Sequence, residues 1–195
     1  MLNYNIVLET PLAILRPLDE SDYDVFLSLA AQDPSMWDYF SLNLSYPDHL
    51  KRWMETAFRE RDAGIRIPFT IMDKRNHAIG GSTSLGNISR YDLRGEIGWS
   101  WLAPAFRSTG LNRHAKYAIM REVFEKHDFE RVEFKTDVQN ERARQGLRRV
   151  GGIEEGILRS HMKMWNNRRR TSVYYSVLKS EWPQLKATIF AGFDK

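Results

Sequence analysis

The sequence of 195 residues contains no cysteine. This absence excludes disulfide bonds, thiolate zinc sites and a cysteine nucleophile, and it is typical of a reducing compartment. No apolar run approaches the roughly 20 residues that a membrane-spanning helix requires. The first residues, MLNYNIVLETPL, also lack the basic start and the long apolar run of a secretory signal. We therefore expect a soluble, cytoplasmic protein.

The sequence also has little excess charge of one sign. Its 29 Lys and Arg residues and 25 Asp and Glu residues leave a formal net charge of +4. Such a mild excess suits an anionic small ligand as well as nucleic acid. The five His residues show no spacing typical of metal ligands, so we assign no metal. Repeats and low-complexity segments are absent, which excludes solenoids and disordered arrays.

The amino-terminal third predicts a strand followed by two helices. Alternating aliphatic residues indicate the strand over residues 12–18, and acidic residues after it mark the start of a helix that Pro34 ends. A second helix begins at Pro47, presents apolar side chains at helical spacing and stops at Gly64.

After residue 66 the apolar pattern changes to a period of two, which is typical of strands. We expect three antiparallel strands, a long helix, a strand, a short helix and a hairpin with an Asn-Asn turn, over residues 67–73, 78–88, 94–103, 111–126, 131–138, 140–150, 153–165 and 168–179. The full order is β-α-α-β-β-β-α-β-α-β-β. It predicts a single α+β domain over residues 1–195, with a largely antiparallel sheet flanked by helices.

The segment RSTGL, residues 107–111, joins the third of these antiparallel strands to the long helix. The start of a helix leaves several N–H groups without partners and carries about half a positive charge. Gly110 lets the backbone approach a ligand closely, and Arg107 adds a full charge with a forked donor geometry. The segment therefore predicts a phosphate or diphosphate site. A loop whose glycine serves only packing is an equal alternative on this segment alone.

Three segments in order resemble the GNAT family of acetyl-CoA-dependent N-acyltransferases, and within it the RimJ/RimL-like branch that acetylates protein amino groups. They are the strand EIGWSWL with the R-x-x-G-x-N turn, the stretch DVQNERARQGLRRVGGIEEGILR, and the stretch TSVYYSVLKSEWP. The family's Q/R-x-x-G-x-G/A pattern stands here as RSTGLN, so Asn112 departs from a small last residue. The likeness covers a core from about residue 12 to 183, which leaves a short carboxy-terminal extension.

The resemblance implies where acetyl-CoA is bound. In the family, the sheet opens beside the strand that carries GWSWLA, and the pantetheine pairs with the exposed main chain as a pseudo-strand. This implies pantetheine contacts at Trp101, Leu102 and Ala103. The implied diphosphate contacts are Arg107, Ser108, Thr109, Gly110, Leu111 and Asn112. Asn140 stands where the family places an asparagine near the cofactor. A plain helix N-cap is the alternative for Asn140, and both roles can hold together.

Glu96 resembles the family's glutamate on this strand, and we interpret it as the general base, acting directly or through a water. Its apolar neighbours would desolvate the carboxylate and raise its pKa. The alternative is an ordinary strand residue that faces solvent or pairs with Arg94.

The general acid is less defined, because Ala143 stands where relatives often have a serine. The candidate donors are Tyr174 or its neighbour Tyr175, Ser100, and water. A protein that binds acyl-CoA without turnover is the alternative that Ala143 favours.

The connection SMWDYFSLNLSYP between the first two helices is rich in aromatic residues. We expect Trp37 and Tyr39, assisted by Asp38, to form a wall for a peptide or ring-bearing amine. The alternative is that these rings close the core. Near the carboxy terminus, Trp182, Phe190 and Phe193 are candidates for a contact between two copies of the chain, a homodimer.

The expected function is transfer of an acetyl group from acetyl-CoA to a primary amine in a ternary complex, with a protein N-terminal amino group as the favoured acceptor. A small amine, such as a polyamine or an antibiotic-like molecule, is the alternative acceptor. The run Arg168-Arg169-Arg170 has no interleaved aromatic platform, so we interpret it as a solvated hairpin tip and not as a nucleic-acid patch. The alternative function, a basic protein associated with RNA, is supported by the charge alone.

Overall fold

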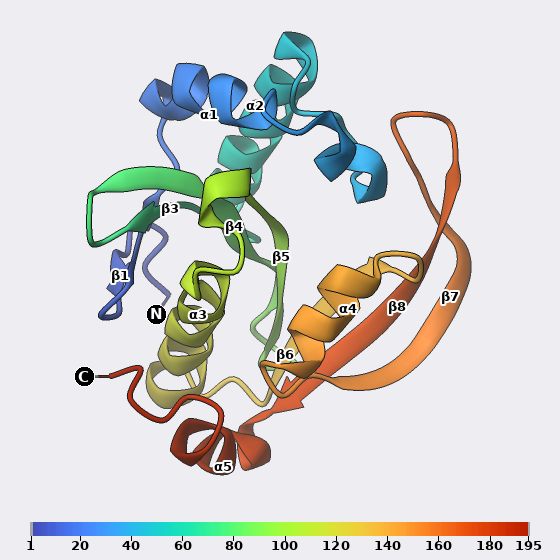
Figure 1. Cartoon of the computed structure of the whole chain (residues 1–195). Helices are drawn as coiled ribbons and strands as arrows, with labels where there is room; N and C mark the ends of the chain where they lie inside the picture. Colours follow the sequence, from blue (N-terminus) through green and yellow to red (C-terminus); the bar gives the residue numbers. More distant parts are fainter. Residues whose placement is uncertain (1, 195) are drawn as a thin grey trace.

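The computed structural model describes residues 2–194 and contains one eight-stranded sheet of order β1-β2-β3-β4-β5-β6-β8-β7 (Figure 1). Neighbouring strands are antiparallel except β5 and β6, which are parallel. The strands are β1 (Leu8–Glu9), β2 (Ala13–Pro17), β3 (Ile67–Asp73), β4 (Ala78–Ser89), β5 (Arg94–Leu102), β6 (Arg131–Asp137), β7 (Ile153–Lys163) and β8 (Arg169–Leu178). The helices are α1 (Tyr23–Ala30), α2 (Pro47–Asp62), α3 (Leu111–Lys126), α4 (Glu141–Arg148) and α5 (Trp182–Ala187).

The predicted order of elements is confirmed, as is the largely antiparallel sheet flanked by helices. Two elements were not predicted. β1 has only two residues and α5 only six, and both are too short to show a periodicity of their own. Four short 3-10 helices, which complete the turns, were also not predicted; they are Glu20–Asp22, Pro34–Tyr39, Pro104–Phe106 and Lys179–Glu181.

Helices cover both faces of the sheet, and each face has its own apolar cluster. α3, α4 and α5 pack on one face, where Leu111, Leu147 and Trp182 contribute to the larger cluster. In Figure 1, α3 and α4 lie in front of the sheet. α1 and α2 contribute Phe26 and Trp53 to the second cluster.

The aromatic residues near the carboxy terminus correct an expectation. Trp182 and Phe190 are buried against Tyr117 of α3, with ring centroids 5.6 and 5.1 Å from that ring. Phe193 stacks on His114 at 3.9 Å. These rings are therefore part of the chain's own core and are not exposed for a contact between two copies. Apolar residues that follow the last strand give no sequence signal of whether they fold back or stay exposed.

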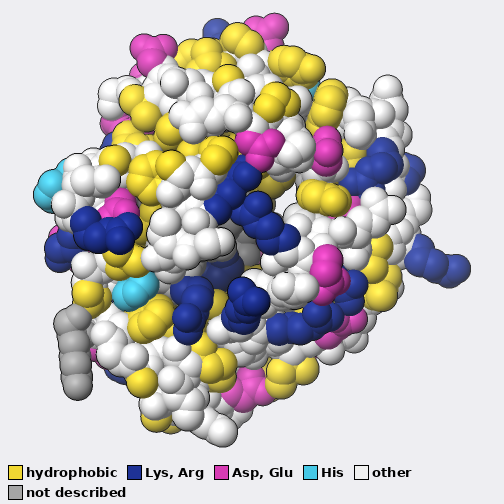
Figure 2. Space-filling view, viewed as in Figure 1, with side chains coloured by type: hydrophobic (Ala, Val, Ile, Leu, Met, Phe, Trp, Pro, Cys, Tyr) yellow, Lys and Arg dark blue, Asp and Glu magenta, His cyan; other side chains and the backbone are white. Residues whose placement is uncertain are grey.

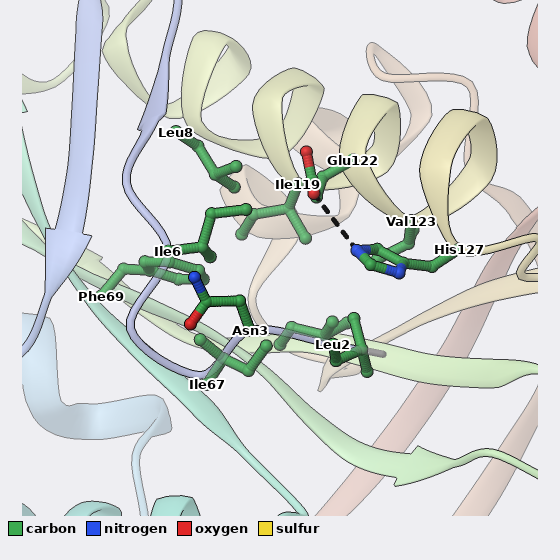
Figure 3. Close-up of a pocket in the computed structure, with 11 residues that line it drawn as sticks. Leu2, Asn3, Ile6, Leu8, Ile67, Phe69, Ile119, Glu122, Val123 and His127 are labelled. Atoms are coloured by element: carbon green, nitrogen blue, oxygen red, sulfur yellow. Dashed lines mark hydrogen bonds and ion pairs between the residues drawn. The ribbon is translucent and has the colours of Figure 1, made fainter.

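A small cavity lies between the amino-terminal segment and α3 (Figure 3), and its lining is mainly apolar. His127 Nε2 lies 3.2 Å from Glu122 Oε1 there. The other lining residues are Leu2, Asn3, Ile6, Leu8, Ile67, Phe69, Leu85, Ile119 and Val123. The cavity belongs to the core at the far end of α3 from the segment RSTGL.

Asp22 ties the amino-terminal part to the sheet. Its side chain is 1% exposed. Its carboxylate accepts hydrogen bonds from Arg16 Nη1 at 2.9 Å, Thr70 Oγ1 at 2.6 Å and the main-chain N–H of Asp19 at 3.1 Å. One buried carboxylate therefore holds β2, β3 and the start of α1 together.

We expect Asp22→Ala to lower the free energy of unfolding by about 3 kcal/mol, because the half-buried Arg16 guanidinium and the buried Thr70 hydroxyl both lose their acceptor. Urea unfolding followed by circular dichroism measures this. Asp24→Ala is the matched control, since Asp24 is exposed on α1, and it should change the value by less than about 1 kcal/mol. Equal losses in the two variants would contradict the assignment.

Candidate active site

The parallel strands β5 and β6 are joined over only three ladder pairs, Arg94 with Arg131, Gly95 with Val132, and Glu96 with Glu133. Beyond Glu96, no ladder pair joins the two strands within residues 2–194. The pairing of β4 with β5 also shifts register near this point, and Trp99 has a φ of 54°. Such a bulge bends a strand away from its neighbour. Figure 2 shows a hollow near the middle of this side of the molecule, with Lys and Arg side chains around it.

The turn before α3 presents free main-chain N–H groups. Gly110 is the N-cap with a φ of 91°, and its carbonyl accepts the first helical hydrogen bonds at 2.9 and 3.1 Å. Ser108 also has a positive φ, 62°. In the described part of the chain, the N–H groups of four residues have no hydrogen-bond acceptor: Ser108, Thr109, Gly110 and Asn112. The N–H group of Leu111 has only a long contact of 3.4 Å to Thr109 Oγ1. These groups are therefore available to an anion from outside the chain.

Arg107 is held by the protein itself. Its Nη1 contacts Asp33 Oδ2 at 2.5 Å, its Nε donates to the carbonyl of Leu102 at 3.1 Å, and its Nη2 lies 3.0 Å from Met36 Sδ. The guanidinium therefore joins the turn to the segment after α1. Arg142, in the first turn of α4, was not predicted. Burial lowers the pKa of Arg142, and the neighbouring charge of Arg107 lowers it further.

A second unpredicted cation stands beside the turn. Lys116 on α3 is 6% exposed, and its Nζ donates to Asn112 Oδ1 at 2.6 Å. Burial lowers the pKa of this lysine to about 8. Because Lys116 occupies the side-chain oxygen of Asn112, the side-chain NH2 group of Asn112 points away from Lys116. The signal in the sequence was an Asn and a Lys four residues apart, which is one helical turn.

The three implied pantetheine contacts lie at the end of β5. The ring of Trp101 is buried against Phe26 and Trp37, at centroid distances of 5.0 and 5.5 Å. The carbonyl of Leu102 accepts from Arg107, and the N–H of Ala103 donates to the carbonyl of Gly80 at 2.9 Å. A ligand beside this stretch would meet main chain and not the indole ring.

Glu96 is 3% exposed, and its Oε2 accepts from Asn87 Nδ2 at 2.8 Å and from Lys135 Nζ at 2.9 Å. It therefore neither faces solvent nor pairs with Arg94, which contacts Asp92 and Glu133. Lys135 lies on β6, the strand that parts from β5. Neither Asn87 nor Lys135 was predicted, because their contacts with Glu96 cross strands.

Tyr174 on β8 lies opposite Lys135 in the ladder with β6. Burial raises the pKa of Tyr174, while the nearby charge of Lys135 lowers it and that of Glu96 raises it. Tyr175 points to the other face, where its hydroxyl donates to Glu154 at 2.7 Å. Ser100 pairs with Thr83 Oγ1 at 2.7 Å. The structure thus places Tyr174 opposite Lys135, the ion-pair partner of Glu96, and engages Ser100 and Tyr175 elsewhere.

Asn140 is the N-cap of α4, and its Oδ1 accepts from the N–H of Ala143 at 3.0 Å. The capping alternative is therefore confirmed. Ala143 itself carries no donor in its side chain.

The aromatic connection corrects the predicted acceptor wall. Trp37 is 0% exposed, packs on Phe40 and Trp101, and donates from Nε1 to the carbonyl of Ala30 at 3.0 Å. Its ring thus closes the core, which was the alternative. Tyr39 is half-buried and Asp38 is exposed. The main-chain carbonyls of both residues contact arginine side chains of the β7–β8 hairpin.

The arginine run is not a solvated tip, which corrects a second expectation. Arg168 Nη2 donates to Asp137 Oδ2 at 2.6 Å and to the carbonyl of Asp38 at 2.9 Å. Arg170 is buried, and only Arg169 is exposed. The sequence could not show this, because the partners lie about 30 and 130 residues away.

No helix within residues 2–194 is long and apolar enough to cross a membrane. The same residues contain no group of three or more His, Asp or Glu side chains placed to hold a metal ion.

The site thus combines an eight-stranded sheet that parts between two parallel strands with a helix whose N-terminal amides are free. The family model described as acetyltransferase (GNAT) domain matches residues 13–153. The chain therefore belongs to the GNAT acetyltransferase family and is an acyltransferase, and its likeness to the RimJ/RimL-like branch is confirmed.

Individual relatives agree with this family. The chain is 28% identical over 172 residues to "Putative ribosomal N-acetyltransferase YdaF" of Bacillus subtilis, with 86% of this chain and 92% of that protein covered. It is similar to a GCN5-related N-acetyltransferase from Brucella melitensis, with a TM-score of 0.87, 24% identity, and 96% and 85% of the two chains covered. It also resembles Mycobacterium smegmatis RimJ in complex with CoA-disulfide, with a TM-score of 0.80, 20% identity, and coverage of 96% and 94%.

We expect Lys116→Met to stabilise the ligand-free protein by about 1–3 kcal/mol, because it removes a buried ammonium with which no carboxylate of residues 2–194 forms an ion pair. Urea unfolding at several pH values measures this. A folded pKa of about 8 lies below that of the unfolded lysine. The wild-type protein therefore gains stability as pH rises from about 8 to about 10.4, and the advantage of methionine shrinks over that window. A destabilised variant at pH 7 would contradict the assignment.

Proposed function

We propose that the protein transfers the acetyl group of acetyl-CoA to a primary amine, with a peptide or protein N-terminal amino group as the favoured acceptor. The observation that carries the proposal is the pair of features on either side of the β5–β6 opening. One is the set of free N–H groups at the start of α3, and the other is the buried Glu96 at the last ladder pair. The name of the Bacillus subtilis relative, a ribosomal N-acetyltransferase, supports a protein acceptor.

The residues present fit the proposed co-substrate. The free N–H groups of Ser108, Thr109, Gly110 and Asn112 would hold the diphosphate, aided by the helix dipole. The side-chain amide of Asn112 and the guanidinium of Arg142 would add donors and charge. The pantetheine would follow the main chain of β5 at residues 101–103, where β6 has turned away. Asn140 would stand at the mouth of the same opening, on the turn that begins α4. Bound acetyl-CoA supplies the thioester carbonyl that the amine attacks.

The side chains then have two proton transfers to perform. Glu96 accepts a proton from the acceptor's ammonium or amine, directly or through a water, as the new N–C bond forms. The ion pair with Lys135 holds the carboxylate of Glu96 in place at the opening. Tyr174 donates its proton to the departing sulfur as the C–S bond breaks. Because burial raises its pKa, the phenol retains its proton at neutral pH until then. Holding the two reactants together in the opening supplies much of the remaining rate enhancement.

A protein that binds acyl-CoA without turnover is the second candidate, and the observation that favours it is Ala143, which has no proton to give. Tyr174 argues against this candidate, because it offers a hydroxyl donor on β8 opposite Lys135, the ion-pair partner of Glu96.

We expect Glu96→Gln to lower kcat/KM for an amine acceptor about 100-fold or more, while the affinity for CoA changes little. Thiol release measures the rate, and calorimetry measures the affinity. Glu133→Gln is the matched control, because Glu133 is the ladder partner of Glu96 and contacts Arg94 and Arg131 instead. The proposed base would be wrong if the two variants were equally active.

Gly110→Ala should weaken CoA binding about tenfold. A side chain at a φ of 91° is strained, and the added Cβ would lie 3.3 Å from Leu12, so the turn must shift. Gly192→Ala is the control, since Gly192 has a φ of 88° but open space around it, far along the chain from the turn. Titration calorimetry with CoA compares the two. Unchanged affinity in Gly110→Ala would exclude the turn as the diphosphate site.

A further inference from the structure

Arg170 on β8 is buried with one edge of its guanidinium unused. The residue is 7% exposed, and its Nη1 makes a long contact of 3.4 Å to the carbonyl of Tyr39. Its Nε and Nη2 are both buried and have no hydrogen-bond partner among residues 2–194. These two nitrogens lie on the same edge of the planar group. That edge matches the two oxygens of a carboxylate, so it can bind one in a bidentate manner.

Arg170 lies on the face of the sheet that is opposite to α3, α4 and α5. Val173, Tyr175 and Val177 of β8 belong to the cluster under α3, α4 and α5. Because side chains alternate along a strand, Arg170 and Tyr174 point to the opposite face. Burial lowers the pKa of Arg170, whereas the nearby charges of Asp137 and Glu96 raise it. Arg170 therefore shares a face with the proposed base and acid.

The nearby carboxylates are already engaged. Asp137 accepts from Arg168 at 2.6 Å and from the N–H of Gln139 at 3.0 Å. Glu96 accepts from Lys135 and Asn87. A buried guanidinium without a paired anion is costly to fold. The anion that would complete this site must therefore come from outside the chain.

Arg66, the other buried arginine on this face, does not have the same vacant edge. Its Nη1 pairs with Glu60 at 3.1 Å, its Nε donates to Ser84 Oγ at 2.8 Å, and its guanidinium lies 4.3 Å from the ring centre of Trp99. Only its Nη2 is without a partner in the part of the chain that the structure describes. Most hydrogen-bond donors of the Arg66 guanidinium therefore have partners within the protein. Arg170, in contrast, retains a free edge that can bind a carboxylate.

We propose that Arg170 binds a carboxylate of the amine acceptor, so that the preferred acceptor is a peptide with an acidic side chain close to its N-terminus. This inference rests on the proposed function. Arg170 and Tyr174 are four residues apart on one strand, which is about 13 Å. An extended peptide with its amino group at Glu96 and Tyr174 covers that distance in about four residues. The acidic side chain is therefore expected within the first four positions.

The test compares pentapeptides with Asp at position 2, 3 or 4 with the same peptides carrying Asn. Thiol release at saturating acetyl-CoA gives kcat/KM for each. We expect the wild-type enzyme to prefer Asp at one position roughly 10- to 100-fold, as for a hydrogen-bonded charged group. Arg170→Gln should bring this ratio close to one. Arg169→Gln is the matched control, because the exposed Arg169 contacts Ser160, and it should keep the ratio.

A readout without turnover separates this inference from the proposed function. In the Glu96→Gln background with CoA bound, calorimetry should show the Asp peptide binding more tightly than the Asn peptide, and Arg170→Gln should remove the difference. Loss of binding or activity toward both peptides alike would identify Arg170 as a structural residue only. Absence of any Asp preference in the wild-type protein, in rate and in binding, would overturn the inference. If the Asp preference in binding is seen but no amine is acetylated, the proposed function fails and the anion site stands.

Discussion

The candidate active site depends on the short pairing between two parallel strands. β5 and β6 share three ladder pairs and then part after Glu96. If pairing continued, the main chain of β5 would be covered, and Glu96 would be an interior residue with no reacting group near it. Because the strands part, main-chain groups at the end of β5, the free amides that begin α3 and a buried carboxylate all border one opening. The bulge at Trp99 is the local feature that bends β5 away.

The charges around this opening are arranged at a cost to stability. Among residues 2–194, no carboxylate lies at hydrogen-bonding distance from the buried cations Lys116 and Arg170. A protein selected only for stability would place apolar side chains at such positions. Lys116 lies beside the turn before α3 and Arg170 lies on β8, whereas the whole chain has a net charge of only +4. These two unpaired buried cations, and not the total charge, favour an anionic ligand.

The sequence predicted the periodic elements well and the long-range contacts poorly. α3 was expected over residues 111–126 and has these bounds, because Gly110 and the apolar spacing mark its start and its face. Glu96 was singled out from a strand pattern, but its partner Lys135 is 39 residues away and only the sheet order brings them together. The aromatic connection was misjudged for the same kind of reason. Whether Trp37 lines a surface or fills the core depends on how α1 packs on β5, and no local pattern encodes that.

The segment after α1 links the two halves of the site. Asp33 holds Arg107, at the turn before α3, whereas the carbonyl of Trp37 accepts from Trp165 Nε1 at 3.0 Å and that of Tyr39 contacts Arg170. A single stretch of seven residues, 33–39, thus contacts both the proposed diphosphate turn and the proposed carboxylate site. Its central anchor is the buried ring of Trp37, so neither end can move far without disturbing the core. The connection therefore fixes the distance between the two proposed binding sites through packing, although the ring of Trp37 fills the core and does not line a surface.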